Sequence, residues 1–123
     1  MERPLTADAA ELDVDALLAR VYGDRKLLGE LVALLSADYP RLLEQAREAL
    51  QSDDRALLHR AGHTLKGMVA NFCAPGVLAA ATRLEALSHA GDPTEIKTTI
   101  DEVEQRLERL IPALKGLAAQ APP

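Results

Sequence analysis

The sequence has few aromatic side chains, one cysteine and no long apolar run. Tryptophan is absent, and aromatic residues make up only 2% of the 123 positions. The core must therefore be built from the aliphatic residues and alanine that dominate its 48% hydrophobic fraction, a composition typical of a helical bundle. The single cysteine, Cys73, excludes an internal disulfide and favours a reducing compartment.

Two further absences limit the setting in which the chain works. No stretch approaches the roughly 20 apolar residues of a transmembrane helix, and the start Met1-Glu2-Arg3-Pro4 lacks the pattern of a signal peptide. Basic residues are also scarce, because 14 Lys and Arg stand against 19 Asp and Glu, for a formal net charge of −5. We therefore expect a cytoplasmic protein without direct membrane contact and without a nucleic-acid-binding surface.

The length and the apolar periodicity predict a single all-α domain. A chain of 123 residues supports one substantial core and leaves little room for a second. We expect a flexible N-terminus over residues 1–10, a helical domain over residues 11–117 and a flexible tail over residues 118–123. No segment shows the two-residue period of a half-buried strand.

Capping signals indicate where the first helices begin and end. Asp13 can cap a short helix from Val14 to Tyr22, which Gly23 would stop. Asp24 can cap a second helix, which is predicted from about residue 25 to residue 50. A proline at position 40 falls within this run and removes one hydrogen bond from the helix, which predicts either one kinked helix or two abutting helices. We favour the single kinked helix.

The remaining helices follow polar or proline-containing breaks. Gln51-Ser52-Asp53-Asp54 can cap a third helix that ends near Cys73, and Ala74-Pro75-Gly76 precedes a fourth that closes at Gly91. The run Asp92-Pro93-Thr94-Glu95 predicts the start of a fifth helix, because it combines a capping Asp, a first-turn Pro and a Glu three residues after the cap. Four long helices with short connections predict an antiparallel up-down four-helix bundle, with the short N-terminal helix as a lid.

The third predicted helix presents a histidine on its polar side. At 100° per residue its apolar stripe comprises Leu58, Ala61, Leu65, Met68, Val69 and Phe72, whereas the opposite face comprises His59, His63, Lys66, Gly67 and Ala70. His63 should therefore face solvent beside a lysine. Gly62 and Gly67 flank it, although an interior glycine costs about 1 kcal/mol relative to alanine. These glycines suggest that something needs close access to the imidazole.

The run His63-Thr64-Leu65-Lys66-Gly67 resembles the His-x-x-Lys-Gly phosphoacceptor motif of histidine-containing phosphotransfer (HPt) domains. The resemblance extends over roughly residues 12 to 112. Its further matches are Gly23-Asp24, Leu27-Leu28, Leu31, Leu34-Leu35, Asp38-Tyr39-Pro40, Ala49-Leu50, Asn71-Phe72, Ala74 and Leu84-Glu85. One position departs from the family, because Cys73 stands where a second glycine is common.

The resemblance implies a phosphorelay intermediate that accepts a phosphoryl group on His63 and passes it on. An exposed imidazole suits this task because it is nucleophilic near neutral pH. Lys66 would stabilise the phosphoryl charge, and Gly67 would leave room for the partner. The resemblance also implies that Glu85 accepts a hydrogen bond from His63 Nδ1 and so orients the ring.

The partners implied are response-regulator receiver domains, and a hybrid sensor histidine kinase that carries one. We expect their docking face to include Arg55, His59, Gly62 and Ala70. Arg83 and His89, in the fourth predicted helix, are candidates for contact at the edge of the site. The domain itself should bind no cofactor and have no ATP site or kinase activity, so that the Mg²⁺ needed for transfer would be held by the receiver. A transient partner of this kind favours a monomer.

The sequence leaves three alternatives for the role of His63 and its helix face. His63 could be a solvated surface histidine, and the same face could serve a helical adaptor that binds a partner without phosphorylation. His59 and His63 also have the i, i+4 spacing of a zinc pair. Position 60 is Arg rather than the Glu of a metalloprotease helix, however, and the sequence offers no obvious third ligand.

Overall fold

The structure, a computed structural model, describes residues 12–120. The elements are α2 (Val14–Arg20), α3 (Arg25–Gln51), α4 (Arg55–Val69), the 3₁₀ turn η1 (Ala70–Phe72), α5 (Pro75–Leu87) and α6 (Pro93–Ala119). The flexible segment expected over residues 1–10 lies outside the described residues, as does the end of the tail, residues 121–123. No helix within residues 12–120 combines the length and apolarity that crossing a membrane requires.

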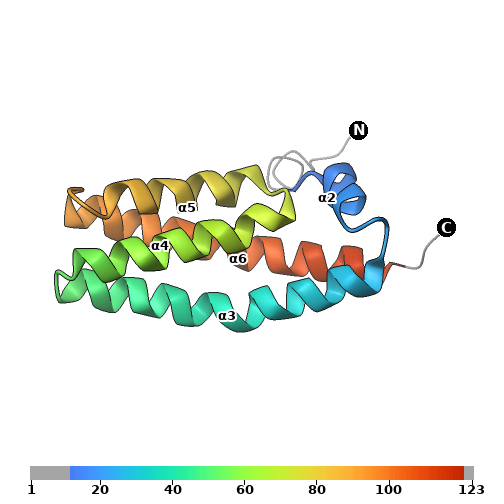
Figure 1. Cartoon of the computed structure of the whole chain (residues 1–123), viewed down its shortest axis with the longest axis horizontal. Helices are drawn as coiled ribbons and strands as arrows, with labels where there is room; N and C mark the ends of the chain where they lie inside the picture. The colour runs from blue at the N-terminus through green and yellow to red at the C-terminus, as the bar shows by residue number, and fades with distance from the viewer. Residues whose placement is uncertain (1–11, 121–123) are drawn as a thin grey trace.

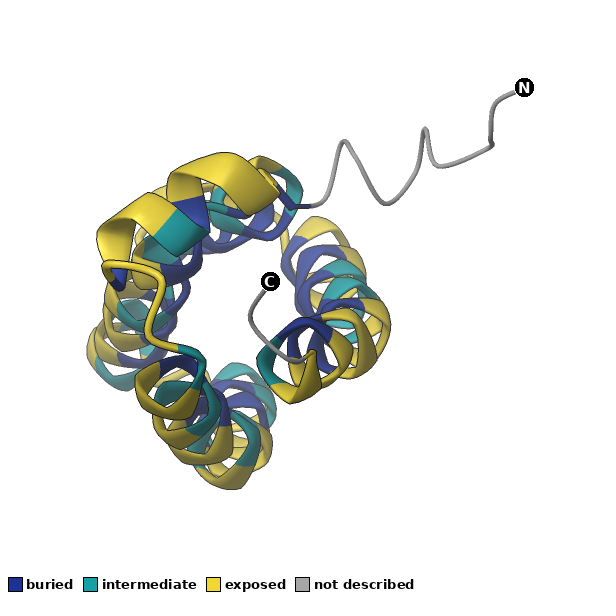
Figure 2. Cartoon of the chain, turned by 90° about the vertical axis from the view of Figure 1, so that its right-hand side faces the viewer, coloured by how far each residue is buried: buried dark blue, intermediate teal, exposed yellow. Residues whose placement is uncertain are grey.

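The four long helices form the predicted up-down bundle. Neighbouring helices run in opposite directions, and α2 lies across one end of the bundle (Figure 1). The pairs α3–α4, α4–α5, α5–α6 and α3–α6 are in contact, so that the helices form a closed ring. Each helix turns its buried side towards the common axis (Figure 2).

Aliphatic side chains fill the space between the helices, as the shortage of aromatic residues required. The largest fully buried ones are Leu17, Leu28, Leu35, Leu43, Leu58, Leu65, Leu84, Ile96, Ile100, Leu107, Leu110 and Leu114. Leu17 belongs to α2, so the short helix covers the end of the core as the lid prediction required. The Asp13 amide donates to the carbonyl of Cys73 at 2.9 Å and thereby attaches the start of α2 to the residue that follows η1.

The predicted capping residues are confirmed at each helix start that they specified. Asp13, Asp24 and Asp54 accept from the amides of Ala16, Leu27 and Leu57, respectively. The carboxylate of Asp92 accepts from the amides of Thr94 and Glu95. These bonds satisfy amides that have no partner within the helix, which is why short polar residues fix the helix starts so reliably.

Four helix details differ from the predictions at or near a terminus. Helix α2 ends at Arg20 rather than Tyr22, because Tyr22 and Gly23 take left-handed conformations with φ of 57° and 71°. Helix α5 ends at Leu87 rather than Gly91. Residues 118 and 119, which we assigned to the tail, complete α6. The third helix reaches its predicted end only through the 3₁₀ turn η1, which the left-handed Cys73 terminates with a φ of 53°.

Helix α3 continues through Pro40, which confirms one helix rather than two. Pro40 is exposed on its outer side, so the missing hydrogen bond costs no core contact.

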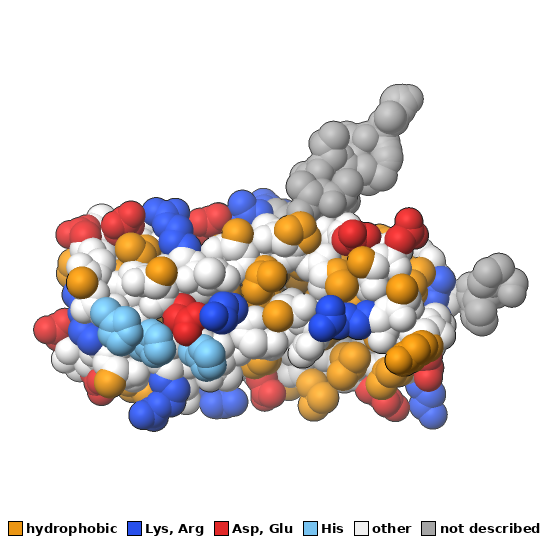
Figure 3. Space-filling view, turned by 45° about the horizontal axis from the view of Figure 1, so that its top comes forward, with side chains coloured by type: hydrophobic (Ala, Val, Ile, Leu, Met, Phe, Trp, Pro, Cys, Tyr) orange, Lys and Arg blue, Asp and Glu red, His pale blue; other side chains and the backbone are white. Residues whose placement is uncertain are grey.

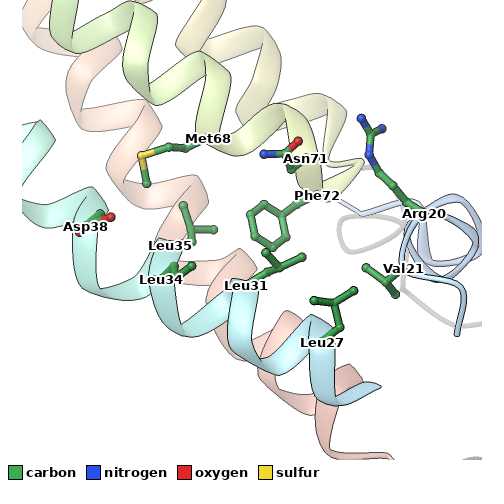
Figure 4. Close-up of a pocket in the computed structure, with 10 residues that line it drawn as sticks. All are labelled: Arg20, Val21, Leu27, Leu31, Leu34, Leu35, Asp38, Met68, Asn71 and Phe72. Atoms are coloured by element: carbon green, nitrogen blue, oxygen red, sulfur yellow. The ribbon is translucent and has the colours of Figure 1, made fainter. Parts of the chain in front are cut away.

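An apolar groove of about 470 Å³ lies where α2, α3 and the end of α4 meet. It is lined by Leu27, Leu31, Leu34 and Leu35 of α3, Met68 of α4, and Asn71 and Phe72 of η1, with Arg20, Val21 and Asp38 at its edges (Figure 4). Leu34 remains 62% exposed beside this groove.

Candidate functional site

Three side chains of α4 face one carboxylate of α5. His59, His63 and Lys66 have the spacing i, i+4, i+7, which aligns them along one side of α4. Glu85 occupies the facing position on α5, where only 15% of its side chain is exposed. Histidine side chains gather on this face beside an acidic and a basic group (Figure 3). The site is thus built between two rigid helices of the bundle.

Both oxygens of Glu85 are engaged. Oε2 lies 2.7 Å from Nδ1 of His63 and 3.5 Å from Nε2 of His59. Oε1 lies 2.6 Å from Nζ of Lys66. The carboxylate of Glu85 therefore contacts both the candidate nucleophile, His63, and the neighbouring cation, Lys66.

The Glu85 contact determines which nitrogen of His63 can react. A carboxylate accepts a hydrogen bond, so Nδ1 of the neutral ring carries the proton and Nε2 carries the free electron pair. The His63 side chain is 65% exposed, which leaves the ring open to an incoming molecule. The geometry is that of an oriented nucleophile with its reactive atom on the surface.

Glu85 is held in its charged form. The hydrogen bonds from Lys66 and His63 lower the pKa of Glu85 below its ordinary value of 4.5, with a smaller coulombic contribution from the same two groups. The acceptor for the His63 Nδ1 proton is consequently present throughout the neutral pH range.

Two other histidines extend the site along the surface. The rings of His59 and His63 are stacked with centroids 6.3 Å apart, and His89, just beyond α5, lies 4.4 Å from His59 by the same measure. The sequence placed His89 only at the edge of the site. The structure brings it onto His59, a contact that no spacing rule within a single helix could have found.

Two small residues, Gly67 and Ala70, follow Lys66 near the end of α4. Gly67 is exposed, and a Cβ built there would meet no atom within 4 Å. Ala70 is partly buried at the start of η1. At Gly67, one turn after His63, the surface therefore carries no side chain, as the polar-face pattern predicted.

Gly62 and Arg55, which we expected on the docking face, make contacts within the domain instead. Gly62 is buried against α5, so the expectation that it offers a surface to a partner is wrong. The guanidinium of Arg55 contacts Asp53 and donates to the carbonyls of Ser88 and Gly91. Arg55 thereby holds the connection that follows α5 rather than extending freely along the histidine face.

Arg83, another candidate for the edge of the site, forms an ion pair with Glu95 at 3.1 Å. Among residues 12–120, no three His, Cys, Asp or Glu side chains are grouped so that they could hold a metal ion.

The site and the fold together define a class of protein: a rigid helical bundle that presents one exposed imidazole, oriented by a carboxylate and placed beside a cation. The Hpt domain model matches residues 30–120, which is most of the chain. The chain therefore belongs to the Hpt domain family, whose members act in two-component phosphorelays.

A solved structure has the same fold. The HPT domain of an Hpt sensor hybrid histidine kinase from Shewanella superposes with a TM-score of 0.71 at 22% sequence identity, over 91% of this chain and 97% of that one. This match confirms the predicted bundle. The comparison with curated proteins finds no significant match.

Proposed function

We propose that this domain accepts a phosphoryl group on Nε2 of His63 from the aspartyl phosphate of one receiver domain and transfers it to an aspartate of another. The observation that carries the proposal is the 2.7 Å contact between His63 Nδ1 and Glu85 in a member of the Hpt family. The Shewanella neighbour is part of a hybrid histidine kinase, which supports a receiver domain as the class of partner.

The chemistry follows from the protonation state that Glu85 favours. The free electron pair of Nε2 attacks phosphorus, the bond from phosphorus to the aspartyl oxygen breaks, and the aspartate leaves as a carboxylate. The ring keeps its Nδ1 proton and becomes cationic. Glu85, already charged and 2.7 Å away, stabilises that positive charge. Transfer to the second receiver reverses these bond changes.

Lys66 gives the site its positive charge near the phosphoryl group. Its ammonium contacts Glu85 Oε1, and the Lys66 side chain is 34% exposed, so the ammonium can turn towards a phosphoryl oxygen while staying close to the carboxylate. We propose that the domain supplies this cation and no cofactor, kinase activity or ATP site, and that the Mg²⁺ is held by the carboxylates of the receiver. The domain would work as a monomer that meets its partners transiently.

Incubation with a phosphorylated receiver domain tests the proposal. We expect an acid-labile, base-stable label on the wild-type protein and none on His63→Gln. His89→Gln is the matched control, since it removes an exposed imidazole outside the proposed reaction and should keep the label. A receiver that binds without labelling His63 would contradict phosphotransfer and favour the helical adaptor.

A further inference from the structure

Gly62 lies where the backbone of α5 packs tightly against α4. A Cβ at this position would be 3.2 Å from both Cα and N of Glu85 and 3.4 Å from Cγ of Leu84. Such distances are shorter than about nine in ten real Cβ contacts, so the neighbouring backbone would have to move by a few tenths of an ångström. By contrast, a Cβ at Gly67 or Gly116 would enter open space.

The two backbone atoms nearest to that Cβ belong to Glu85, the residue that orients the imidazole. His63 is the next residue along α4, and Lys66 follows one turn later. Any separation of the helices at Gly62 therefore acts directly on the contacts of 2.7 Å and 2.6 Å that Glu85 makes with these two side chains. Hydrogen bonds of this length weaken when their partners move apart.

We infer that Gly62 is a positioning residue, whose missing side chain sets the separation of α4 and α5 at which Glu85 bridges His63 and Lys66. This role rests on the proposed phosphotransfer at His63. Glycine lowers helix stability relative to alanine, so helix formation alone favours a different residue at this position.

The surrounding structure transmits a displacement instead of absorbing it. Leu84 is fully buried in the core, and the hydroxyl of the buried Ser88 donates to the Glu85 carbonyl at 2.6 Å. These contacts fix the backbone of Glu85 from both sides. Alanine at position 62 would consequently shift this part of α5 relative to α4, and the carboxylate would move with it.

The test compares Gly62→Ala with Gly116→Ala, which makes the same chemical change in an exposed helical position. ¹⁵N NMR of the imidazole side chains reports the proton on His63 Nδ1 or Nε2 without any phosphotransfer. We expect Gly62→Ala to lower the Nδ1–H fraction and to slow phosphotransfer by about threefold to tenfold, since misplacement by 1 Å can cost about 100-fold. Gly116→Ala should change neither quantity.

A double variant separates positioning from general packing. In a Glu85→Ala background, the Gly62→Ala substitution should have no further effect on the His63 tautomer, because the carboxylate through which it acts is gone. A wild-type tautomer and rate in folded Gly62→Ala would overturn the inference. A further tautomer change of the same size in the Glu85→Ala background would also overturn it.

The readouts also distinguish this inference from the proposed function. Failure to phosphorylate the wild-type protein would contradict the proposed function, whereas the tautomer measurement would still report the positioning.

If Gly62→Ala does not fold, the same substitution is made together with Cys73→Gly, which replaces a cysteine in the left-handed conformation elsewhere in the chain. Loss of folding in both backgrounds would overturn the inference in favour of a purely structural glycine.

Discussion

His63 and Glu85 belong to different helices, yet their side chains meet at 2.7 Å between Nδ1 and Oε2. The contact exists because α4 and α5 are adjacent in the bundle and come close together at Gly62. The same carboxylate also binds Lys66. One acidic side chain thereby controls both the tautomer of the nucleophile and the position of the cation.

The lowered pKa of Glu85 predicts how this site contributes to stability as the pH changes. The charged carboxylate is favoured in the folded state by Lys66 and His63, so its contribution is present above the ordinary pKa of 4.5. It is lost as the pH falls through the lower pKa of the folded state. We expect the difference in free energy of unfolding between wild type and Glu85→Gln to be larger at pH 6 than at pH 3.

Urea unfolding at a series of pH values measures that difference. Glu95→Gln provides the control, because Glu95 also faces a cation, Arg83, but lies outside the histidine site. A difference that grows as the pH falls would show that Glu85 is not stabilised in its charged form.

Lys66→Ala tests the role of the cation. Removing the ammonium should leave the fold intact, since Lys66 is partly exposed and contributes no core side chain. Phosphotransfer to and from receivers should slow by about tenfold to 100-fold, roughly 1.4 to 2.8 kcal/mol of transition-state stabilisation. The control is Lys97→Ala, which removes an exposed lysine paired with Asp101 on α6. Equal rates for Lys66→Ala and Lys97→Ala would remove Lys66 from the mechanism.

The sequence was sufficient to predict the bundle because its signals are local. Aspartate caps, prolines at helix starts and a sustained apolar stripe each act within a few residues, and they predicted the order and approximate bounds of every described helix. The errors fall at helix ends, such as Leu87 and Ala119, where the chain can extend or fray at little cost.

The site was predicted only in part, because half of it depends on contacts between helices. The pattern of α4 was enough to place His63 and Lys66 on one exposed side. The contact of Glu85 was expected only from the family resemblance, since no spacing within one helix relates it to α4. Gly62 was misplaced for the same reason: the helical wheel puts it beside the acceptor face, but the position of α5 determines that it is buried.

Cys73 offers a test of backbone strain at the end of the histidine helix. Its φ of 53° lies in the left-handed region, which costs most residues roughly 1 to 2 kcal/mol and glycine almost nothing. Cys73→Gly should therefore stabilise the fold by about 1 kcal/mol, after allowing for the greater freedom of glycine in the unfolded chain.

Thermal or urea unfolding measures this gain, and Cys73→Ala is its control. Alanine also removes the thiol but retains a Cβ, so it should not stabilise the protein in the way glycine does. The same gain from both variants would indicate that the thiol, and not the backbone conformation, is responsible.

Gly67→Ala separates access to His63 from stability. Because the added methyl group would meet no atom of this chain within 4 Å, alanine should stabilise α4 by about 0.5 to 1 kcal/mol through its higher helix propensity. A receiver that must approach His63 across this bare surface would nevertheless meet the methyl group. We therefore expect a more stable protein whose phosphotransfer from a receiver falls by about tenfold, the equivalent of roughly 1.4 kcal/mol.

Phosphorylation by a small donor such as phosphoramidate distinguishes steric exclusion from damage to the nucleophile. The small donor does not dock on α4, so its rate with Gly67→Ala should equal the wild-type rate, while the receiver-dependent rate falls. A parallel loss with both donors would mean that the methyl group disturbs His63 itself. An unchanged rate with the receiver would show that the open space at Gly67 is not on the path of the partner.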